Sequence, residues 1–277
     1  MSPANPNDAS SGSTVVTKKY QTLLVEIRDR VATVSLNRPD VRNAFHPDMI
    51  RELTQAFEAL SADPKVTIVI LRGEGKSFCS GADLGYMKSM AQFSLEQNQT
   101  DSKQLYGMFW TIRSCPHPII GRLHGHVMGG ALGLASLCDV AAAVDGTQFC
   151  FSEVKLGLAP AVISPFVLEK MTASYARRYM LTGEVFGVGE AKASGLIQHH
   201  GDEADVDQFV QELLHGMLSN GAHAVRATKK LLRQVEERSA WLERRELTTH
   251  LIAELRVGAE GQEGLKAFLE KRSPSWK

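Results

Sequence analysis

The chain has 277 residues, of which 43% are hydrophobic and 22% are charged, and its formal net charge is zero. This composition is typical of a folded domain with a sizeable buried core, and it gives no electrostatic reason to expect nucleic acid or an anionic membrane surface as a partner. Because no apolar run approaches the ~20 residues of a membrane-spanning helix, the sequence does not predict a membrane protein either.

The N-terminal part predicts a leader, a hairpin and a helix, in that order. Residues 1–17 predict a disordered leader without the basic and apolar regions of a secretion signal, so we expect a cytoplasmic protein. Short β-rich runs at 23–27 and 31–36 predict an antiparallel hairpin. His46-Pro47 then opens a helix with proline at its first position. Its apolar stripe consists of Met49, Ile50, Leu53, Phe57 and Leu60.

The middle of the chain alternates between strands and helices, and its strands are apolar enough for a sheet that is covered on both faces. A glycine-bearing loop at 73–85 separates the first of these strands from a helical region. The predicted strands lie at 66–72, 118–125, 139–144 and 148–151, and the predicted helices at about 93–114 and from about 129 to Leu137.

From about residue 164 onward the pattern is helical. Strand–helix alternation followed by a helical tail predicts an α/β core at 18–205 and a helical C-terminal region at 206–277. The apolar residues of this tail need a surface to cover, which is either the core or a neighbouring subunit. The long helical segments of the tail lie near 204–219, 221–237, 240–257 and 261–271.

Two glycine-bearing loops each follow an apolar strand and precede a helix: CSGADLG (79–85) and VMGGALG (127–133). Backbone N–H groups at such places are unpaired, and glycine lets a ligand approach the backbone closely. Two such groups would form an oxyanion hole for the charge that develops on a thioester or acyl oxygen. Tight turns with close helix–strand packing explain the same glycines, so the spacing leaves both interpretations open.

Glu153 is the candidate acid–base residue of the sequence. It lies in FSEVKLGLAP (151–160), between an apolar strand and an apolar segment. Partial burial there would raise the pKa of its carboxyl group and prepare it for proton transfer near neutral pH. A solvent-exposed glutamate at the end of a strand is the alternative.

The sequence predicts no metal site. His124 and His126 alternate along an apparent strand, but no further ligand is spaced to join them. The cysteines form no CxxC pair, so we expect neither a zinc site nor a disulfide framework. These cysteines are Cys79, Cys115, Cys138 and Cys150.

Four motifs, taken in order, resemble the enoyl-CoA hydratase/isomerase (crotonase) superfamily. The resemblance runs from about residue 20 to the end and includes EGLKAFLEKRSP (263–274). It implies an α/β, crotonase-like spiral of repeated ββα units with a helical C-terminal trimerisation region. It also implies an acyl-CoA substrate, a homotrimer or homohexamer, and no cofactor besides the CoA thioester. The motifs are LNRPDVRNAF (36–45), GKSFCSGADL (75–84), HGHVMGGALGLASLCDV (124–140) and FSEVKLGLAPAVISPF (151–166).

The resemblance also implies roles for individual residues. Ala82 and Gly130 match the two positions whose N–H groups bind the thioester oxygen, and Glu153 matches the second of the family's two catalytic glutamates. Phe268 and Lys271 match positions that in some members reach the CoA of a neighbouring subunit. The segment that lines the CoA arm is matched by Ala82, Asp83, Leu84 and Gly85.

Gly133 is a departure from the family pattern, because it stands where the hydratase motif GGxxE has its first catalytic glutamate. A single base that returns the proton it takes would serve a Δ3,Δ2-enoyl-CoA isomerase. Hydration by one glutamate needs another group, or the substrate itself, to orient the water. We expect a 2-enoyl-CoA hydratase first, an isomerase second, and a non-catalytic acyl-CoA-binding protein as a third alternative.

A finer resemblance concerns the substrate. The segments ADLGYMKSM, GGALGLASLCD and FSEVKLGLAPAVISPFV look most like methylglutaconyl-CoA or isohexenylglutaconyl-CoA hydratases, which act in leucine and acyclic-terpene breakdown. Such substrates carry a distal carboxylate, for which Lys155, Arg177 and Arg178 are the candidate cationic partners.

Overall fold

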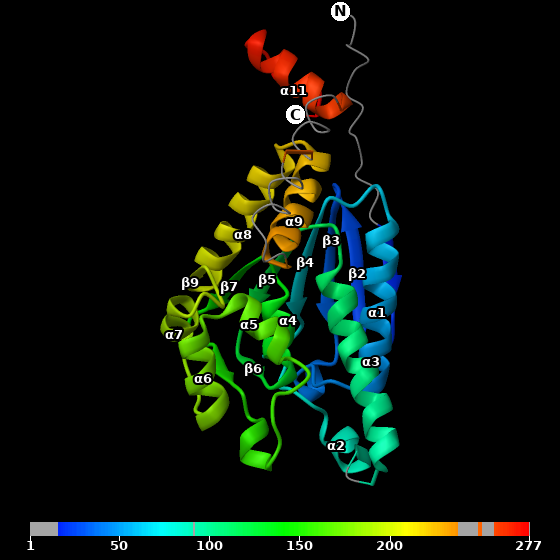
Figure 1. The fold of residues 1–277 in the computed structure, drawn as a ribbon, viewed down its shortest axis with the longest axis vertical. Coiled ribbons are helices and arrows are strands. Elements are labelled where there is room, and N and C mark those ends of the chain that lie inside the picture. The colour runs from blue at the N-terminus through cyan, green and yellow to red at the C-terminus, as the bar shows by residue number, and fades with distance from the viewer. Residues whose placement is uncertain (1–15, 91, 238–248, 251–257, 277) are drawn as a thin grey trace, which may run out of the picture.

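A computed structural model describes residues 16–90, 92–237, 249–250 and 258–276 of the chain (Figure 1). Its centre is a seven-stranded sheet in the order β1-β2-β3-β4-β5-β7-β9. The first three strands pair antiparallel and the remaining pairs are parallel. The strands are β1 (Val16–Lys19), β2 (Leu23–Arg28), β3 (Val31–Leu36), β4 (Ile68–Gly73), β5 (Ile119–Leu123), β7 (Val140–Val144) and β9 (His199–Gly201).

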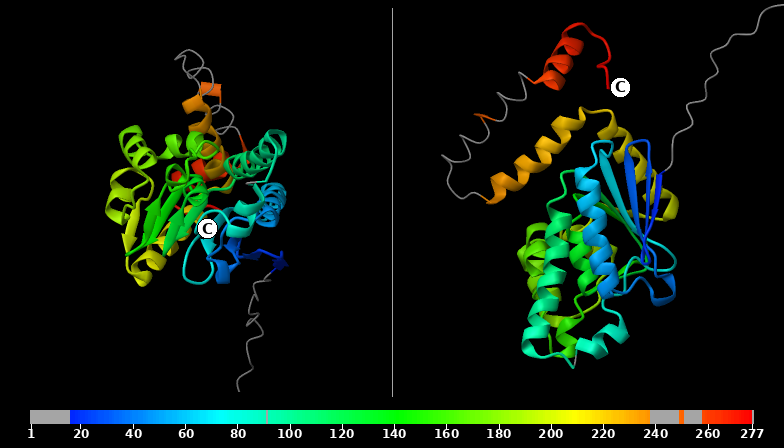
Figure 2. Two further views of the ribbon diagram at one scale, coloured as in Figure 1. Left: turned by 90° about the horizontal axis from the view of Figure 1, so that it is seen from below. Right: turned by 90° about the vertical axis from the view of Figure 1, so that its right-hand side faces the viewer.

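Helices cover both faces of this sheet, as its continuous apolar strands predict. On one face α1 and α3 lie side by side (Figures 1 and 2), and the apolar stripe expected for α1 is buried. On the other face Val210 and Leu214 of α8 pack against Ile68 and Ile120 of the sheet. The helices are α1 (Pro47–Ala62), α2 (Leu84–Met90), α3 (Leu95–Arg113), α4 (Gly130–Ser136), α5 (Ser164–Lys170), α6 (Ala173–Thr182), α7 (Val188–Ala193), α8 (Glu203–Leu218), α9 (Ala222–Glu237) and α11 (Ala259–Leu269), with 3₁₀ turns η1 (Pro39–Val41) and η2 (Glu153–Leu156).

A second sheet of two parallel strands, β6 (His126–Met128) and β8 (Gln148–Cys150), lies beside the first. The chain leaves β5 and enters β6 at Gly125, whose φ is +62°. The single strand expected to run through both histidines is therefore wrong, because the chain changes sheets between them. His124 Nε2 lies 2.9 Å from the Gly75 carbonyl oxygen, and His126 Nδ1 lies 3.1 Å from Ser77 Oγ.

Three further differences from the sequence prediction arise from contacts rather than periodicity. β1 begins at Val16, inside the expected leader 1–17, because it pairs with β2. α2 forms at the end of the expected loop, where the Asp83 carboxylate accepts hydrogen bonds from backbone N–H groups of the first turn. β9 forms in a region expected to be helical, where its three residues add to the edge of the sheet beside β7.

The expected domain boundary at 205/206 falls within α8, which packs on the sheet. Beyond it, α9 and α11 extend from the core (Figure 2), and α11 lies at the opposite end of the molecule from α2 (Figure 1). The Glu260 carboxylate of α11 accepts hydrogen bonds from the N–H groups of His223 and Ala224, at 3.0 and 2.7 Å, and so caps α9. Nearly all of the helix expected at 240–257 lies outside the described residues.

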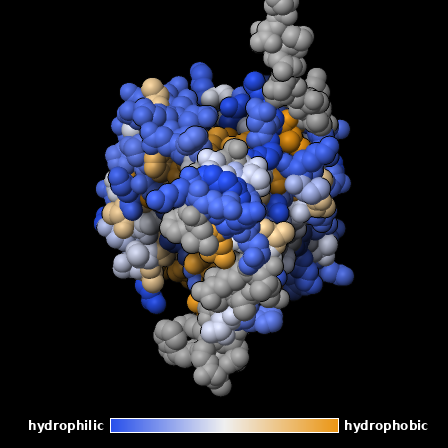
Figure 3. All heavy atoms as spheres, turned by 90° about the horizontal axis from the view of Figure 1, so that it is seen from above, coloured by the Kyte–Doolittle hydropathy of each residue, from blue (hydrophilic) through white to orange (hydrophobic). Residues whose placement is uncertain are grey.

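The C-terminal helices expose apolar side chains. Leu232 of α9 is 59% exposed and Leu265 of α11 is 50% exposed. On the face that carries α11, hydrophobic atoms lie among hydrophilic ones (Figure 3). None of the helices within the described ranges has the length and apolar character that crossing a bilayer requires.

Replacing Gly125 with alanine should destabilise the fold much more than replacing Gly146. Both residues have positive φ, +62° and +83°, so each alanine carries a conformational cost of about 1–2 kcal/mol. A Cβ on Gly125 would lie 2.1 Å from the Lys76 carbonyl oxygen, whereas one on Gly146 meets nothing within 4 Å. We expect Gly125→Ala to lower the free energy of unfolding, measured in urea, by about 1–3 kcal/mol more than Gly146→Ala. Equal losses would contradict this close approach.

Candidate active site

The two predicted glycine loops lie side by side. The N–H of Cys79 donates to the carbonyl of His126 at 3.0 Å, and the N–H of Met128 donates to the carbonyl of Cys79 at 3.1 Å. Gly81, two residues further on, has φ +90°, and a Cβ there would lie 3.1 Å from the Met128 carbonyl oxygen. Glycine is therefore needed at this position for both its conformation and the closeness of β6.

The backbone N–H of Ala82 points away from Phe45, which pairs with the residues on either side of Ala82. The N–H of Phe45 donates to the carbonyl of Gly81 at 2.7 Å, and the N–H of Asp83 donates to the carbonyl of Phe45 at 2.9 Å. Successive peptide groups of an extended chain point in opposite directions, so the N–H of Ala82 itself points away from Phe45. Ala82 is exposed, and within the described parts of the chain its N–H makes no hydrogen bond to protein.

The second loop presents the N–H of Gly130, the first residue of α4. Its predecessor Gly129 donates its own N–H to the Cys150 carbonyl at 2.9 Å and adopts φ 53°, ψ −124°, a conformation that favours glycine. Among the residues that the structure describes, no group accepts the N–H of Gly130. A Cβ on Gly130 would lie 3.1 Å from the Phe45 ring, so Phe45 contacts both loops.

Glu153 lies beside the second loop, as the first residue of η2. A Cβ on Gly129 would lie 3.3 Å from Glu153 Oε1, so the missing side chain of Gly129 leaves room for the carboxylate. Glu153 Oε2 is buried without a hydrogen-bond partner among the described residues. Burial raises the pKa of this carboxyl group above its ordinary value of 4.5, against a smaller lowering by its own backbone N–H.

Ala82, Gly130 and Glu153 supply groups that can stabilise negative charge and transfer a proton. Two unpaired N–H groups, from Ala82 and Gly130, can hold negative charge on an oxygen atom. A partly desolvated carboxylate with one unpaired oxygen, that of Glu153, can take up and return a proton. In the described part of the chain, no group of three His, Cys, Asp or Glu side chains is arranged to hold a metal ion.

Gly133 is buried in α4, and its surroundings are apolar. A Cβ at this position would lie 2.7 Å from Ile163 Cγ2 and 2.7 Å from Phe109 Cε1. Phe109 is fully buried and Ile163 is 3% exposed. Hydrophobic side chains therefore fill the place that the family's first glutamate would take. The sequence analysis did not predict this role of Phe109 and Ile163. The apolar face of α3, on which Phe109 lies, was the signal that could have indicated it.

The segment expected to line the CoA arm begins with a fixed carboxylate. Asp83 forms an ion pair with Arg38 at 2.9 Å, and it accepts the N–H of Gly85 at 2.8 Å. Burial alone would raise the pKa of Asp83, but the hydrogen bonds from Arg38, Tyr86 and Gly85 outweigh it and lower that pKa. Leu84 is 77% exposed. The sequence contained no periodic signal for Arg38, which lies 45 residues before Asp83.

The three candidate cations for a distal carboxylate lie in α6 and in η2. Arg178 forms an ion pair with Glu184 at 2.6 Å on the exposed side of α6. Lys155 Nζ donates to Cys150 Sγ at 3.9 Å, and Lys155 lies in η2 two residues after Glu153. Arg177 is exposed on α6. The structure therefore places the two arginines on the exposed side of α6, whereas Lys155 shares a turn with Glu153.

Phe268 and Lys271 lie in the C-terminal region, at α11 and just beyond it. The backbone of Phe268 belongs to α11, but its side chain lies outside the described part of the structure. Lys271 is exposed and has φ 52°. Because α11 lies at the end of the molecule opposite α2 (Figure 1), neither residue joins the site of its own chain.

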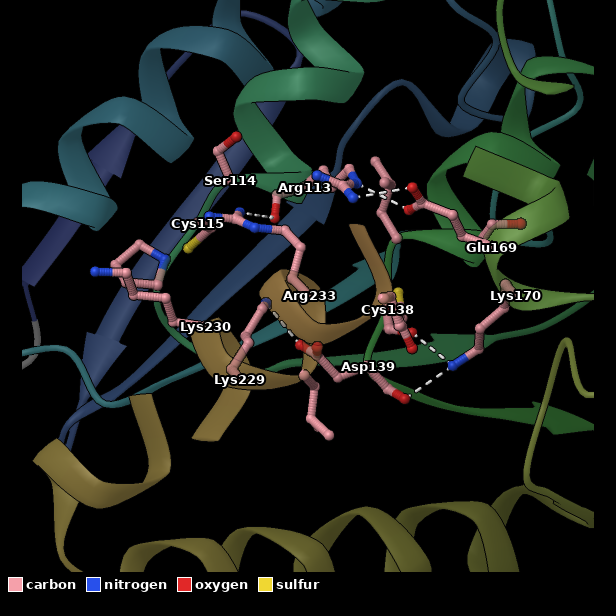
Figure 4. Close-up of a pocket in the computed structure, with 15 residues that line it drawn as sticks. Arg113, Ser114, Cys115, Cys138, Asp139, Glu169, Lys170, Lys229, Lys230 and Arg233 are labelled. Atoms are coloured by element: carbon pink, nitrogen blue, oxygen red, sulfur yellow. Dashed lines mark hydrogen bonds and ion pairs between the residues drawn. The ribbon is translucent and has the colours of Figure 1, made fainter. Parts of the chain in front are cut away.

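A separate cavity of about 470 Å³ lies between α3, α4, α5 and α9 (Figure 4). It contains none of the predicted site residues. Lys170 donates to the carbonyls of Cys138 and Asp139 at 2.9 and 2.8 Å, and Lys229 donates to the carbonyl of His117 and the carboxylate of Asp139 at 2.8 and 2.7 Å. These cations thus satisfy backbone carbonyls around α4 and join α9 to the core.

The chain matches known enoyl-CoA hydratases in sequence and in fold. A family model described as enoyl-CoA hydratase/isomerase matches residues 26–277. The chain is 32% identical over 248 residues to enoyl-CoA hydratase ACTT6 of Alternaria alternata, and the matched stretch covers 88% of this chain and 80% of that protein. It is 29% identical over 260 residues to 2,3-dehydroadipyl-CoA hydratase of Escherichia coli K12, with 92% and 98% covered. The crystal structure of an enoyl-CoA hydratase from Shewanella pealeana is 40% identical, with 92% of this chain and 96% of that one covered and a TM-score of 0.88.

Alanine at Gly133 should destabilise the protein, whereas alanine at a helical glycine with free space should not. Gly216 of α8 has nothing within 4 Å of its Cβ position, so Gly216→Ala should stabilise the fold by up to about 1 kcal/mol. Gly133→Ala should cost about 1–3 kcal/mol through overpacking against Phe109 and Ile163. Urea denaturation measures both changes. In a double-mutant cycle the cost of Gly133→Ala should shrink in a Phe109→Ala background, and an unchanged cost would contradict the contact.

Proposed function

This chain belongs to the enoyl-CoA hydratase/isomerase family, and we propose that it adds water to the double bond of a 2-enoyl-CoA thioester. The expected crotonase-type α/β fold is confirmed by the likeness to solved structures of this family. The observation that carries the proposal is the buried Glu153 Oε2 next to the loop that contains Gly129 and Gly130; among the described residues, neither this oxygen nor the N–H groups of Gly130 and Ala82 have a hydrogen-bond partner.

In the proposed reaction, the N–H groups of Ala82 and Gly130 bind the thioester carbonyl oxygen and withdraw electrons from C3. Ionised Glu153 takes a proton from water as the water oxygen bonds to C3. The electron pair of the double bond moves onto the thioester oxygen as an enolate, whose charge the two N–H groups stabilise. Glu153 then returns the same proton to C2, so that one carboxylate serves as base and acid. This sequence needs no metal and no cofactor besides the CoA of the substrate.

A Δ3,Δ2-enoyl-CoA isomerase is the second candidate, and the surroundings of Gly133 favour it. Phe109 and Ile163 fill the place of a second carboxylate with hydrophobic atoms. A 1,3-proton shift requires only one base that returns the proton it takes, and an apolar wall would keep water away from the intermediate. The hydratase remains the leading proposal because the relatives compared above carry that name.

We propose a branched glutaconyl-CoA, such as 3-methylglutaconyl-CoA, as the substrate of this site. Support comes from the segments around Ala82, Gly133 and Glu153 that look most like glutaconyl-CoA hydratases. The Escherichia coli relative is named for 2,3-dehydroadipyl-CoA, another acyl-CoA with a distal carboxylate. Since Arg178 is paired with Glu184 on α6, the proposal requires a different donor for that carboxylate.

We also propose that the chain works as a homotrimer or homohexamer. The exposed Leu232 and Leu265 of the C-terminal helices support this proposal, because they leave apolar surface for a neighbouring subunit to cover. In such an assembly, Phe268 and Lys271 would serve the CoA of the neighbouring chain, which agrees with the distance of α11 from α2 in Figure 1.

Glu153→Gln should abolish turnover, because an amide cannot take the proton from water. We expect kcat to fall by about 10²- to 10⁴-fold, measured with crotonyl-CoA or 3-methylglutaconyl-CoA. Glu184→Gln is the matched control, since Glu184 is an exposed glutamate paired with Arg178, and it should leave kcat unchanged. Undiminished turnover in Glu153→Gln would refute this mechanism.

Turnover should be lost on the acid side at a pH above 4.5, the ordinary pKa of a glutamate. The base must be ionised, and burial raises the pKa of Glu153. Activity therefore rises with pH through that raised pKa and is lost as pH falls through it. The measurement is kcat/KM against pH for the free enzyme. An acid limb at or below pH 4.5 would contradict a desolvated base.

Product analysis distinguishes the two candidate reactions and the substrate class. Purified enzyme should convert 3-methylglutaconyl-CoA to its 3-hydroxy product with a higher kcat/KM than crotonyl-CoA. With 3-enoyl-CoA, formation of the 2-enoyl isomer without any hydroxyacyl product would replace the hydratase by the isomerase and leave the role of Glu153 intact. CoA binding without either reaction would support a non-catalytic acyl-CoA-binding protein.

A further inference from the structure

Ser152 precedes Glu153 and is the N-cap residue of η2, but its hydroxyl does not cap this turn. A serine at such a position usually accepts an N–H of the first turn through its side-chain oxygen. Here the backbone carbonyl of Ser152 accepts the N–H of Lys155 at 3.1 Å instead. Within the part of the chain that the structure describes, Ser152 Oγ forms no hydrogen bond. The hydroxyl is therefore not used to hold η2 in place.

The Ser152 hydroxyl and the Glu153 carboxylate both lie beside Gly129. A Cβ on Gly129 would lie 3.3 Å from Glu153 Oε1 and 3.6 Å from Ser152 Oγ, and no atom beyond the glycine and its two chain neighbours would be nearer. The next residue is Gly130, whose N–H has no acceptor among the described residues. One residue without a side chain is thus flanked by a free hydroxyl, a carboxylate and an N–H group of the proposed oxyanion hole.

Hydration by a single carboxylate needs a second group that holds the water molecule. Glu153 takes one of the two protons of water, and the oxygen attacks C3 efficiently only if the other proton is also held in a fixed direction. The Gly133 position supplies no acceptor for it, because Phe109 and Ile163 surround that position with carbon atoms. The second acceptor must therefore come from another side of Glu153, and the adjacent hydroxyl is on that carboxylate's own turn.

We propose that Ser152 binds the attacking water and so acts in place of the carboxylate that is absent at Gly133. A serine hydroxyl has two lone pairs, and Ser152 Oγ accepts the proton that the water keeps while Glu153 takes the other one. The water oxygen bonds to C3, the electron pair of the double bond moves to the thioester oxygen, and Glu153 then gives its proton to C2. Ser152 neither gains nor loses a proton. This inference rests on the proposed hydration.

The test compares two reactions of Ser152→Ala. Hydration of crotonyl-CoA should lose about 10- to 100-fold in kcat, because the water is no longer oriented, and KM should stay unchanged, because the thioester is bound through other groups. Exchange of the C2 protons of butyryl-CoA in D₂O uses Glu153 and the two N–H groups but no attacking water, so it should keep its wild-type rate. Glu153→Gln should lower both reactions.

Two further variants separate the hydroxyl from the shape of the loop. Ser152→Thr keeps a hydroxyl on the same carbon and should retain most of the hydration that Ser152→Ala loses. Ser219→Ala is the matched control, because Ser219 Oγ donates to the Gly216 carbonyl at the end of α8, and it should change neither reaction. The urea midpoint of Ser152→Ala should equal that of the wild type, since the hydroxyl that is removed has no protein partner.

The outcomes distinguish the role of Ser152 from the proposed function. Undiminished hydration by Ser152→Ala, or an equal loss of hydration and C2 exchange, would overturn the water-binding role and leave the hydratase proposal in place. Loss of hydration in Ser152→Thr as complete as in Ser152→Ala would also overturn it. Wild-type protein that exchanges the C2 protons but adds water to no 2-enoyl-CoA would refute the hydratase proposal and the role of Ser152 together.

Discussion

The backbone pairing between residues 79–82 and β6 is the constraint on which the candidate site depends. It brings together two loops that are more than 40 residues apart in the chain, each with one backbone N–H, that of Ala82 or Gly130, that has no protein acceptor among the described residues. Three glycines make this arrangement of the two loops and Glu153 possible. Gly81 and Gly125 lie against the backbone of the other loop, and Gly129 leaves room for the Glu153 carboxylate. A side chain at any of them would separate the elements that form the site.

Burial has opposite consequences for the two carboxylates near this space. Glu153 is half-buried with one oxygen unpaired, so burial raises its pKa and leaves it reactive. Asp83 receives hydrogen bonds from Arg38 and from the first turn of α2, which lower its pKa and keep it as a structural anchor. The difference lies in partners rather than in residue type, and it agrees with the proposed roles of Glu153 in proton transfer and of Asp83 in positioning.

The apolar surroundings of Gly133 distinguish this site from family members that have a glutamate at the same position. A family member with glutamate there has two carboxylates, whereas here Phe109 and Ile163 occupy the corresponding space. The packing around Gly133 leaves no room for any side chain, because even the Cβ of an alanine there would lie 2.7 Å from Phe109 and from Ile163. Both proposed reactions, hydration and isomerisation, therefore rely on one carboxylate beside apolar side chains.

By itself, the sequence determined the features that repeat locally or depend on one residue type. Period-two and helical patterns predicted the β2–β3 hairpin, α1 and α3, and the glycine spacing and the position of Glu153 marked the candidate site. Only the tertiary structure decided where the chain changes sheets and that α2 and β9 form. It also decided that Phe109 fills the space beside Gly133, that Arg38 binds Asp83 and that Asp101 binds Tyr86. The physical reason is that periodicity records which face of an element is buried, whereas these features depend on contacts between residues far apart in the chain, which leave no periodic pattern in the sequence.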